Sequence, residues 1–193
     1  MRTALPHLLA ILLLEMLGAG VASAVSVESV DIARTGDAYS VAFEVIVAAN
    51  AADVRRMLIN YHEWPRLSDN VTEARLVPAA STGVQRISVT LRSCIIVGLF
   101  CKVMRQVKDL EALADGSGYV TTFVPGQGDF ASGSESWQIH AESNAATRLR
   151  YEATFVPAFQ VPRLIGPWMI KRALRRELIG AATRLELLAT HGS

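Results

Sequence analysis

The stretch from Val161 to Ala189 reads as a single long helix, and it limits what the rest of the chain can form. Pro167 suits a first helical position, because a missing backbone N–H costs nothing there. Apolar residues recur every three or four positions and share one stripe: Ile170, Leu174, Leu178, Ala181, Leu185 and Leu188. The opposite face is basic: Lys171, Arg172, Arg175, Arg176 and Arg184. Such a helix has to bury its stripe against a partner.

The partner predicted for this helix is a curved antiparallel sheet. Beyond residue 24 no other stretch has a helical pattern of this length, and most of the chain reads as strand. Hydrophobic residues make up 51% of the sequence, enough for a sizeable core. One striped helix packed on one sheet gives an α+β domain. The space between them is then either packed core or a ligand cavity.

The predicted order is strand, strand, two short helices, a run of five or six strands and the long helix. The first strands are Val25–Arg34 and Tyr39–Ala48, and Asn50 is a good N-cap for the helix that follows. The short helices are Ala51–Asn60 and Tyr61–Leu67. The later strands are predicted at Val71–Pro78, Val84–Ile96, Phe100–Leu113, Tyr119–Val124, Phe130–Ala141 and Arg148–Phe155.

Residues 1–24 have the pattern of a secretory signal peptide. Arg2 supplies the positive end, Leu8–Leu14 is an unbroken apolar run, and Ala22–Ala24 resembles a cleavage site. The alternative is an uncleaved membrane anchor, but the run is shorter than the roughly 20 apolar residues a span needs, and Glu15 lies beside it. We therefore expect a mature domain of residues 25–193, exported into an oxidising compartment such as a bacterial periplasm.

The two cysteines, Cys94 and Cys101, are predicted to form a disulfide in such a compartment. A hairpin turn centred between Val97 and Gly98 places them directly opposite each other on paired strands. The alternative is a pair of buried free thiols. Two cysteines and four scattered histidines do not make a metal site, and the sequence predicts neither a metal nor a cofactor.

Three segments carry a resemblance to a known superfamily. They are Ala51–Val77, with its short helix and Trp-Pro turn, Gly133–Ile139 (GSESWQI), and the ending Tyr151–Ala189. Together they resemble the START-like (SRPBCC) superfamily, which includes the polyketide cyclase/dehydrase and coenzyme Q-binding START-like groups. The resemblance implies a helix-grip fold, in which a curved sheet wraps around the C-terminal helix. It also implies a cavity between them that holds a hydrophobic small molecule or lipid.

Aromatic residues and a methionine are the candidate walls of that cavity, because they make a tolerant surface for an apolar ligand. The plain alternative is packed core. The candidate ligand-binding residues are Phe123, Trp137, Tyr151, Phe155, Trp168 and Met169.

Two charged residues are expected at inward positions as well. Glu135 shares the face of Trp137, and Arg105 shares the face of Val103 and Val107. They could orient a polar group of the ligand, or Glu135 could act as a general acid–base. Alternatively they form a structural pair, or a bulge near Gly133 turns Glu135 outward.

These features favour a monomeric binding protein over an enzyme. A net charge of +1 does not indicate nucleic acid as a partner. The basic face of the helix is either solvated or docks transiently on an anionic membrane surface through Lys171, Arg172, Arg175 and Arg176. The alternative function is a polyketide cyclase or dehydratase that uses Glu135.

Overall fold

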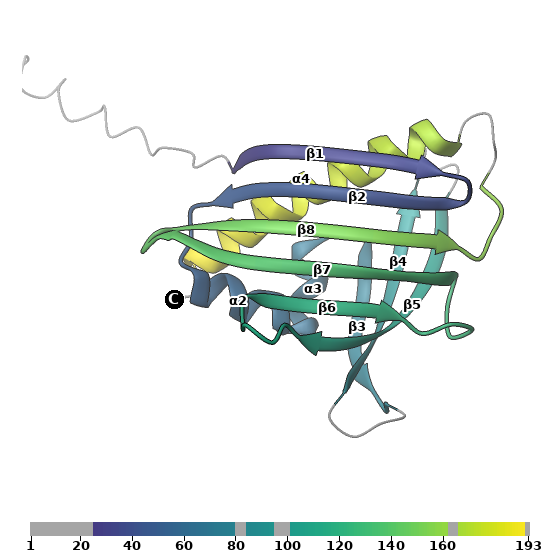
Figure 1. Cartoon of the computed structure of the whole chain (residues 1–193), viewed down its shortest axis with the longest axis horizontal. Coiled ribbons are helices and arrows are strands. Elements are labelled where there is room, and N and C mark those ends of the chain that lie inside the picture. Colours follow the sequence, from purple (N-terminus) through teal and green to yellow (C-terminus); the bar gives the residue numbers. More distant parts are fainter. Residues whose placement is uncertain (1–24, 80–83, 95–100, 162–165, 192–193) are drawn as a thin grey trace, which may run out of the picture.

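A computed structural model describes residues 25–79, 84–94, 101–161 and 166–191. Eight antiparallel strands form one sheet in the order β1-β2-β8-β7-β6-β5-β4-β3 (Figure 1). The expected signal peptide, residues 1–24, lies outside the described residues. The strands are β1 (Ser26–Thr35), β2 (Ala38–Val47), β3 (Val71–Val77), β4 (Gln85–Cys94), β5 (Cys101–Ala112), β6 (Gly118–Phe123), β7 (Phe130–Ser143) and β8 (Ala146–Pro157).

The helices follow the expected order. Helix α2 (Ala51–Ile59) begins after Asn50, whose side chain accepts a hydrogen bond from the Asp53 backbone N–H at 2.9 Å. A 3₁₀ turn (Tyr61–Glu63) leads into α3 (Trp64–Leu67), and α4 (Gly166–His191) ends the described chain. Helix α4 begins beside Pro167, the residue predicted for the first helical position. Val161, the first residue of the predicted stretch, precedes the helix; it stands before Pro162, and the residue before a proline is disfavoured in helical backbone.

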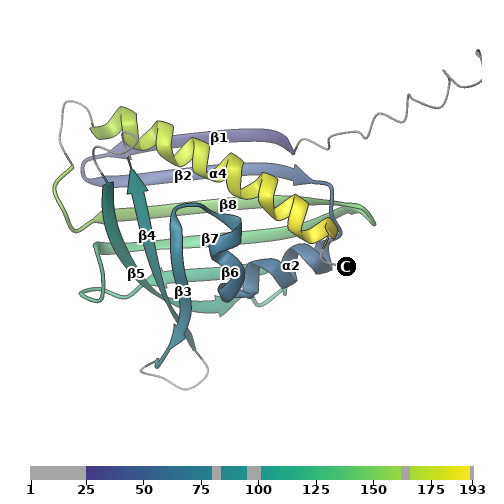
Figure 2. The ribbon, with the colours of Figure 1, turned by 180° about the vertical axis from the view of Figure 1, so that it is seen from behind.

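Helix α4 crosses the concave side of the sheet over β1, β2 and β8 (Figure 2). Its stripe packs into a core cluster with the inward face of β2, where Val45 and Val47 are fully buried and Leu185 is 3% exposed. The buried carboxylate of Glu186 accepts a hydrogen bond from the Ala48 backbone N–H at 2.7 Å. These contacts confirm the helix-grip α+β fold. No helix in the described ranges is long and apolar enough to cross a membrane.

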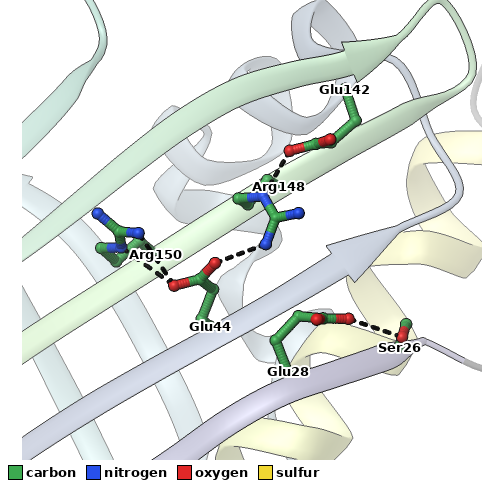
Figure 3. A network of polar contacts seen from close by, with 6 residues as sticks. All are labelled: Ser26, Glu28, Glu44, Glu142, Arg148 and Arg150. Atoms are coloured by element: carbon green, nitrogen blue, oxygen red, sulfur yellow. Dashed lines mark hydrogen bonds and ion pairs between the residues drawn. The ribbon is translucent and has the colours of Figure 1, made fainter.

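The convex side of the sheet is polar. Glu44 on β2 forms ion pairs with two neighbours on β8, at 2.6 Å to Arg148 and 3.1 Å to Arg150 (Figure 3). Arg148 also pairs with Glu142 on β7. Period-2 alternation therefore places charges on one side of these strands and apolar residues on the other.

The β4–β5 hairpin has the predicted register. Cys94 pairs with Cys101 across the ladder, and a disulfide joins them. The turn itself, residues 95–100, lies outside the described residues. The disulfide holds the two strands together where they enter the turn.

Candidate functional site

A cavity of about 380 Å³ lies between the concave face of the sheet, α3 and α4. Its wall is mostly aliphatic and aromatic, with contributions from β2, from strands β4 to β8 and from α4. The stripe of α4 forms one side through Ile170, Leu174, Leu178 and Leu185, as its spacing predicted. A largely apolar concave site of this size is typical of small-molecule binding.

Three of the predicted wall residues line this cavity: Trp137, Tyr151 and Phe155. Trp137 on β7 lies directly opposite Tyr151 on β8, and their ring centroids are 4.3 Å apart. On the other side of β7, Trp137 pairs with Tyr119 of β6, which also lines the cavity. The expected aromatic wall is therefore present at the centre of the sheet.

Three other predicted wall residues lie away from the lining. Phe123 is buried behind it and stacks on Phe130, with ring centroids 5.0 Å apart. Trp168 is 64% exposed, with the Arg172 guanidinium 5.6 Å from its ring centroid. Met169 is half-buried. Trp168 and Met169 fall beside the apolar stripe of α4, so the helical period turns them away from the cavity.

The expected inward orientation of Arg105 was wrong. Its side chain is on the convex side, where Nε donates a hydrogen bond to Ser88 Oγ at 3.2 Å, and Val103 is 62% exposed. The alternate residues Gln106 and Lys108 face the cavity instead. Both faces of β5 mix apolar and polar residues, so alternation alone did not identify the inward one.

Glu135 does face the cavity, and its partner is Lys108. Lys108 Nζ lies 2.7 Å from Glu135 Oε2, and the two side chains are 4% and 11% exposed. Thr121 Oγ1 donates to the same carboxylate oxygen at 3.2 Å. The ammonium group also lies 5.6 Å from the Trp64 ring centroid and 5.4 Å from that of Phe123. These contacts offset part of the cost of burying the two charges.

Gly133 does not turn Glu135 outward, although the register of β7 shifts between Phe130 and Ser132. Gly133 has a positive φ of 155°, and a Cβ there would lie 2.8 Å from Cδ2 of Phe123 and 2.5 Å from the Thr154 carbonyl oxygen. Glycine therefore leaves room for the Phe123 ring against the strand.

Tyr151 completes this polar group. Burial raises the pKa of the Tyr151 phenol well above its usual range, and the neighbouring Glu135 carboxylate raises it further. The phenol therefore stays neutral and can donate a hydrogen bond. A lysine, a glutamate, a threonine and a tyrosine thus gather in a mostly apolar wall.

A second polar group lies where α4 meets the loop after α3. Glu177 accepts hydrogen bonds from Ser68 Oγ and Asn70 Nδ2, and all three residues line the cavity. Sequence reasoning missed this group, and it missed Lys108 and Trp64. Trp64 did carry a signal, because it belongs to the Trp-Pro turn. In the described part of the chain, no three His, Cys, Asp or Glu side chains cluster as metal ligands do.

Comparison with known proteins assigns the chain to a family. The model of the "Polyketide cyclase / dehydrase and lipid transport" family matches residues 38–186, from β2 to the last part of α4. The chain belongs to this family. A search of curated protein sequences found no match.

Solved structures similar to this family member share its fold at low sequence identity. An aromatase/cyclase, Zhui from Streptomyces sp. R1128, has a TM-score of 0.63 at 13% identity, covering 80% of this chain and 94% of that one. A START superfamily protein from Mycobacterium smegmatis has a TM-score of 0.62 at 17% identity, covering 80% and 99%. Human STARD10 has a TM-score of 0.56 at 8% identity, covering 84% and 75%.

This family member thus has the START-like helix-grip architecture and a cavity lined by its own set of polar residues. At these identities the similarity establishes the fold alone. Lys108, Glu135, Glu177 and the apolar wall around them determine which ligands the cavity can hold.

Proposed function

We propose that this protein binds a hydrophobic small molecule or lipid between its sheet and α4, and carries or presents it. The observation that carries the proposal is the cavity of about 380 Å³, whose wall is apolar apart from a few polar groups. Pockets of roughly 300–1,000 Å³ with this composition are typical of small-molecule sites. The family's description, which names polyketide cyclases and lipid transport, is consistent with a ligand of this kind.

The test is binding of an apolar molecule by freshly purified protein. Native mass spectrometry should detect a co-purifying apolar compound that solvent extraction removes. The emptied protein should then bind the neutral fluorophore N-phenyl-1-naphthylamine saturably, with one site per chain. Failure of the emptied protein to bind this probe would contradict the proposal.

We propose that the protein works in the periplasm. The apolar run Leu8–Leu14 and the small residues Ala22–Ala24 support export, and a disulfide suits an oxidising compartment. The basic residues of α4 would then face membranes from outside the cytoplasm.

Transient contact with an anionic membrane surface would suit a lipid carrier. The four exposed cations of α4 support it: Lys171, Arg172, Arg175 and Arg176. Vesicles containing phosphatidylglycerol should retain the protein at low salt and release it at high salt, and vesicles of phosphatidylcholine should not retain it. Equal retention by both kinds of vesicle would contradict an electrostatic contact.

A polyketide cyclase or dehydratase activity is the second candidate, with Glu135 as general acid–base. The position of Glu135 in the cavity beside Thr121 and Lys108 favours it. The carboxylate is already engaged by these two side chains, which favours a binding role over a catalytic one. Glu135→Gln should abolish turnover of a polyketide-like substrate if the protein is an enzyme, and should leave binding of a neutral probe intact in either case.

A further inference from the structure

In the described part of the chain, four charged side chains line the cavity, two acidic and two basic, and they differ in burial. Glu135 and Glu177 are acidic, and Lys108 is the basic side chain deep in the wall. The other lysine of the lining, Lys102, is exposed, and its Nζ lies 3.3 Å from the Phe159 ring centroid. Among the described lining residues, Lys108 and Glu135 are therefore the deeply buried charges, and Glu177 is half-buried.

The Lys108–Glu135 pair offers a ligand both a donor and an acceptor. An ammonium group has three N–H donors, and in the described part of the chain Lys108 uses its Nζ for one hydrogen bond, to Glu135 Oε2. Thr121 donates to that same oxygen, and the Tyr151 phenol also hydrogen-bonds to the Glu135 carboxylate. A carboxylate has about four lone-pair sites, so Glu135 can still accept a hydrogen bond from a ligand. A hydroxyl could bond to both partners, and a carbonyl oxygen could accept from Lys108.

A charged group on the ligand would fit the same place poorly. A carboxylate bound to Lys108 would bring a second negative charge beside Glu135, in a cavity that also contains Glu177. Like charges repel strongly where water is excluded. A ligand ammonium group bound to Glu135 would likewise lie beside the positive charge of Lys108 and be repelled by it.

We infer that the cavity selects an uncharged ligand, an apolar body with a hydroxyl or carbonyl group bound at Lys108 and Glu135. The inference rests on the proposed binding function and adds the charge class of the ligand. Glu135 is then a specificity residue, because it neutralises Lys108 and prevents this lysine from recruiting a free carboxylate. An alcohol or a ketone fits this site, and a fatty acid does not.

The experiment compares three ligands with the same chain length: 1-dodecanol, 2-dodecanone and dodecanoate at pH 7.5. The affinity of each ligand is measured by its displacement of N-phenyl-1-naphthylamine from three proteins. These are the wild type, Glu135→Gln and the double variant Lys108→Met/Glu135→Gln. Circular dichroism and thermal melting check the fold of each protein. Wild type should bind the alcohol and the ketone more tightly than dodecanoate.

A wild-type preference for the alcohol and the ketone over dodecanoate does not by itself test the role of Glu135, because burying any carboxylate is costly. The decisive result is the change on Glu135→Gln, which leaves Lys108 unpaired. The affinity ratio should move toward dodecanoate by about tenfold or more, the usual effect of a hydrogen bond to a charged partner. The same ratio in both proteins, with the probe still bound, would overturn the inference and leave the proposed function standing.

The double variant keeps the inference testable if Glu135→Gln does not fold. It removes both charges and so leaves no unpaired ion. Its affinity for 2-dodecanone should fall about tenfold, because the Lys108 donor is lost. Unchanged affinity for the ketone would overturn the inference. Absence of probe binding by wild type would instead contradict the proposed function itself.

Discussion

At the scale of single residues, the cavity depends on a few side chains that combine packing with a polar role. Lys108 and Glu135 neutralise each other in a wall that is mostly apolar. Trp137 and Tyr151 place their rings against each other beside this pair. Each of these four residues borders empty space as well as protein atoms. Substitutions at these positions should therefore change ligand binding, whereas substitutions in solid core should mainly lower stability.

Trp137→Ala should alter apolar-probe affinity and lower stability less than a change in solid core. Ile87→Ala is the matched control, because Ile87 is fully buried and lies outside the cavity lining. Truncating such a residue costs about 2–5 kcal/mol, whereas removing Trp137 mostly enlarges an existing space. Thermal melting and probe titration on both variants measure the two effects. A larger stability loss for Trp137→Ala, with unchanged probe binding, would show that Trp137 is plain core.

Lys108→Met should lower the free energy of unfolding by about 3–5 kcal/mol, because it leaves Glu135 buried without its cation. The double variant Lys108→Met/Glu135→Gln should recover most of this loss, since it leaves no unpaired charge. Urea unfolding of the three proteins gives the coupling between the two sites. Equal losses in the single and double variants would argue against a buried ion pair.

At the scale of elements, the sheet is held at one end by a covalent link and on its convex face by ion pairs. The disulfide joins β4 to β5, and the Glu44 cluster joins β2 to β8. Both lie outside the hydrophobic core, so each can be removed while the core stays in place.

The Cys94–Cys101 disulfide should leave no free thiol in the denatured, unreduced protein. The loop it closes is short, so the double variant Cys94→Ser/Cys101→Ser should lose about 2–3 kcal/mol at most and still fold. Thiol titration and urea unfolding measure these outcomes. Two reactive thiols per chain in the oxidised protein would contradict the link.

The Glu44 cluster should make stability depend on pH in the acid range. Hydrogen bonds from Arg148 and Arg150 lower the pKa of Glu44 below its usual 4.5. The stabilisation is therefore complete above the unfolded pKa and is lost as the pH falls through the lower folded value. Urea midpoints measured from pH 6 to pH 2.5 should fall less steeply for Glu44→Gln than for wild type. Parallel profiles for the two proteins would contradict this contribution.

At the scale of the whole molecule, α4 and the sheet enclose the cavity, and the polar side chains of α4 connect it to the surrounding loops. Glu177 bonds to Ser68 and Asn70, Arg184 pairs with Asp69, and Glu186 bonds to Ala48. These contacts fix the part of the helix from Glu177 to Glu186 against the loops that follow β2 and α3. The size of the cavity is thus a property of the assembled domain.

The mature protein should begin at Val25, because cleavage is expected after the small residues Ala22–Ala24. Intact mass of the protein recovered from a periplasmic fraction gives the N-terminus directly. Recovery of a chain that still begins with Met1 in the membrane fraction would contradict both cleavage and localisation.

The sequence was sufficient for the elements and their order, because those depend on local spacing. The stripe of α4 and the alternation of Leu149, Tyr151 and Phe155 identified a helix and a strand, and the structure has both. The pairing of Cys94 with Cys101 followed from a short hairpin, in which the turn sets the register.

Alternation within β5 did not decide which face of that strand looks into the cavity, because a strand needs its neighbours to fix an inward side. Val103, Arg105 and Val107 share one face, and the face of Lys108 is also mixed, so alternation could not choose between them. The pairing of β5 with β4 fixes the inward face. The register set by the cysteines places Lys108 opposite the inward-facing Ile87, so Arg105 lies on the convex face. A buried charge depends on the partners brought to it from other strands. Lys108, on β5, meets Glu135, on β7, across the intervening strand β6, a contact that local sequence pattern does not encode.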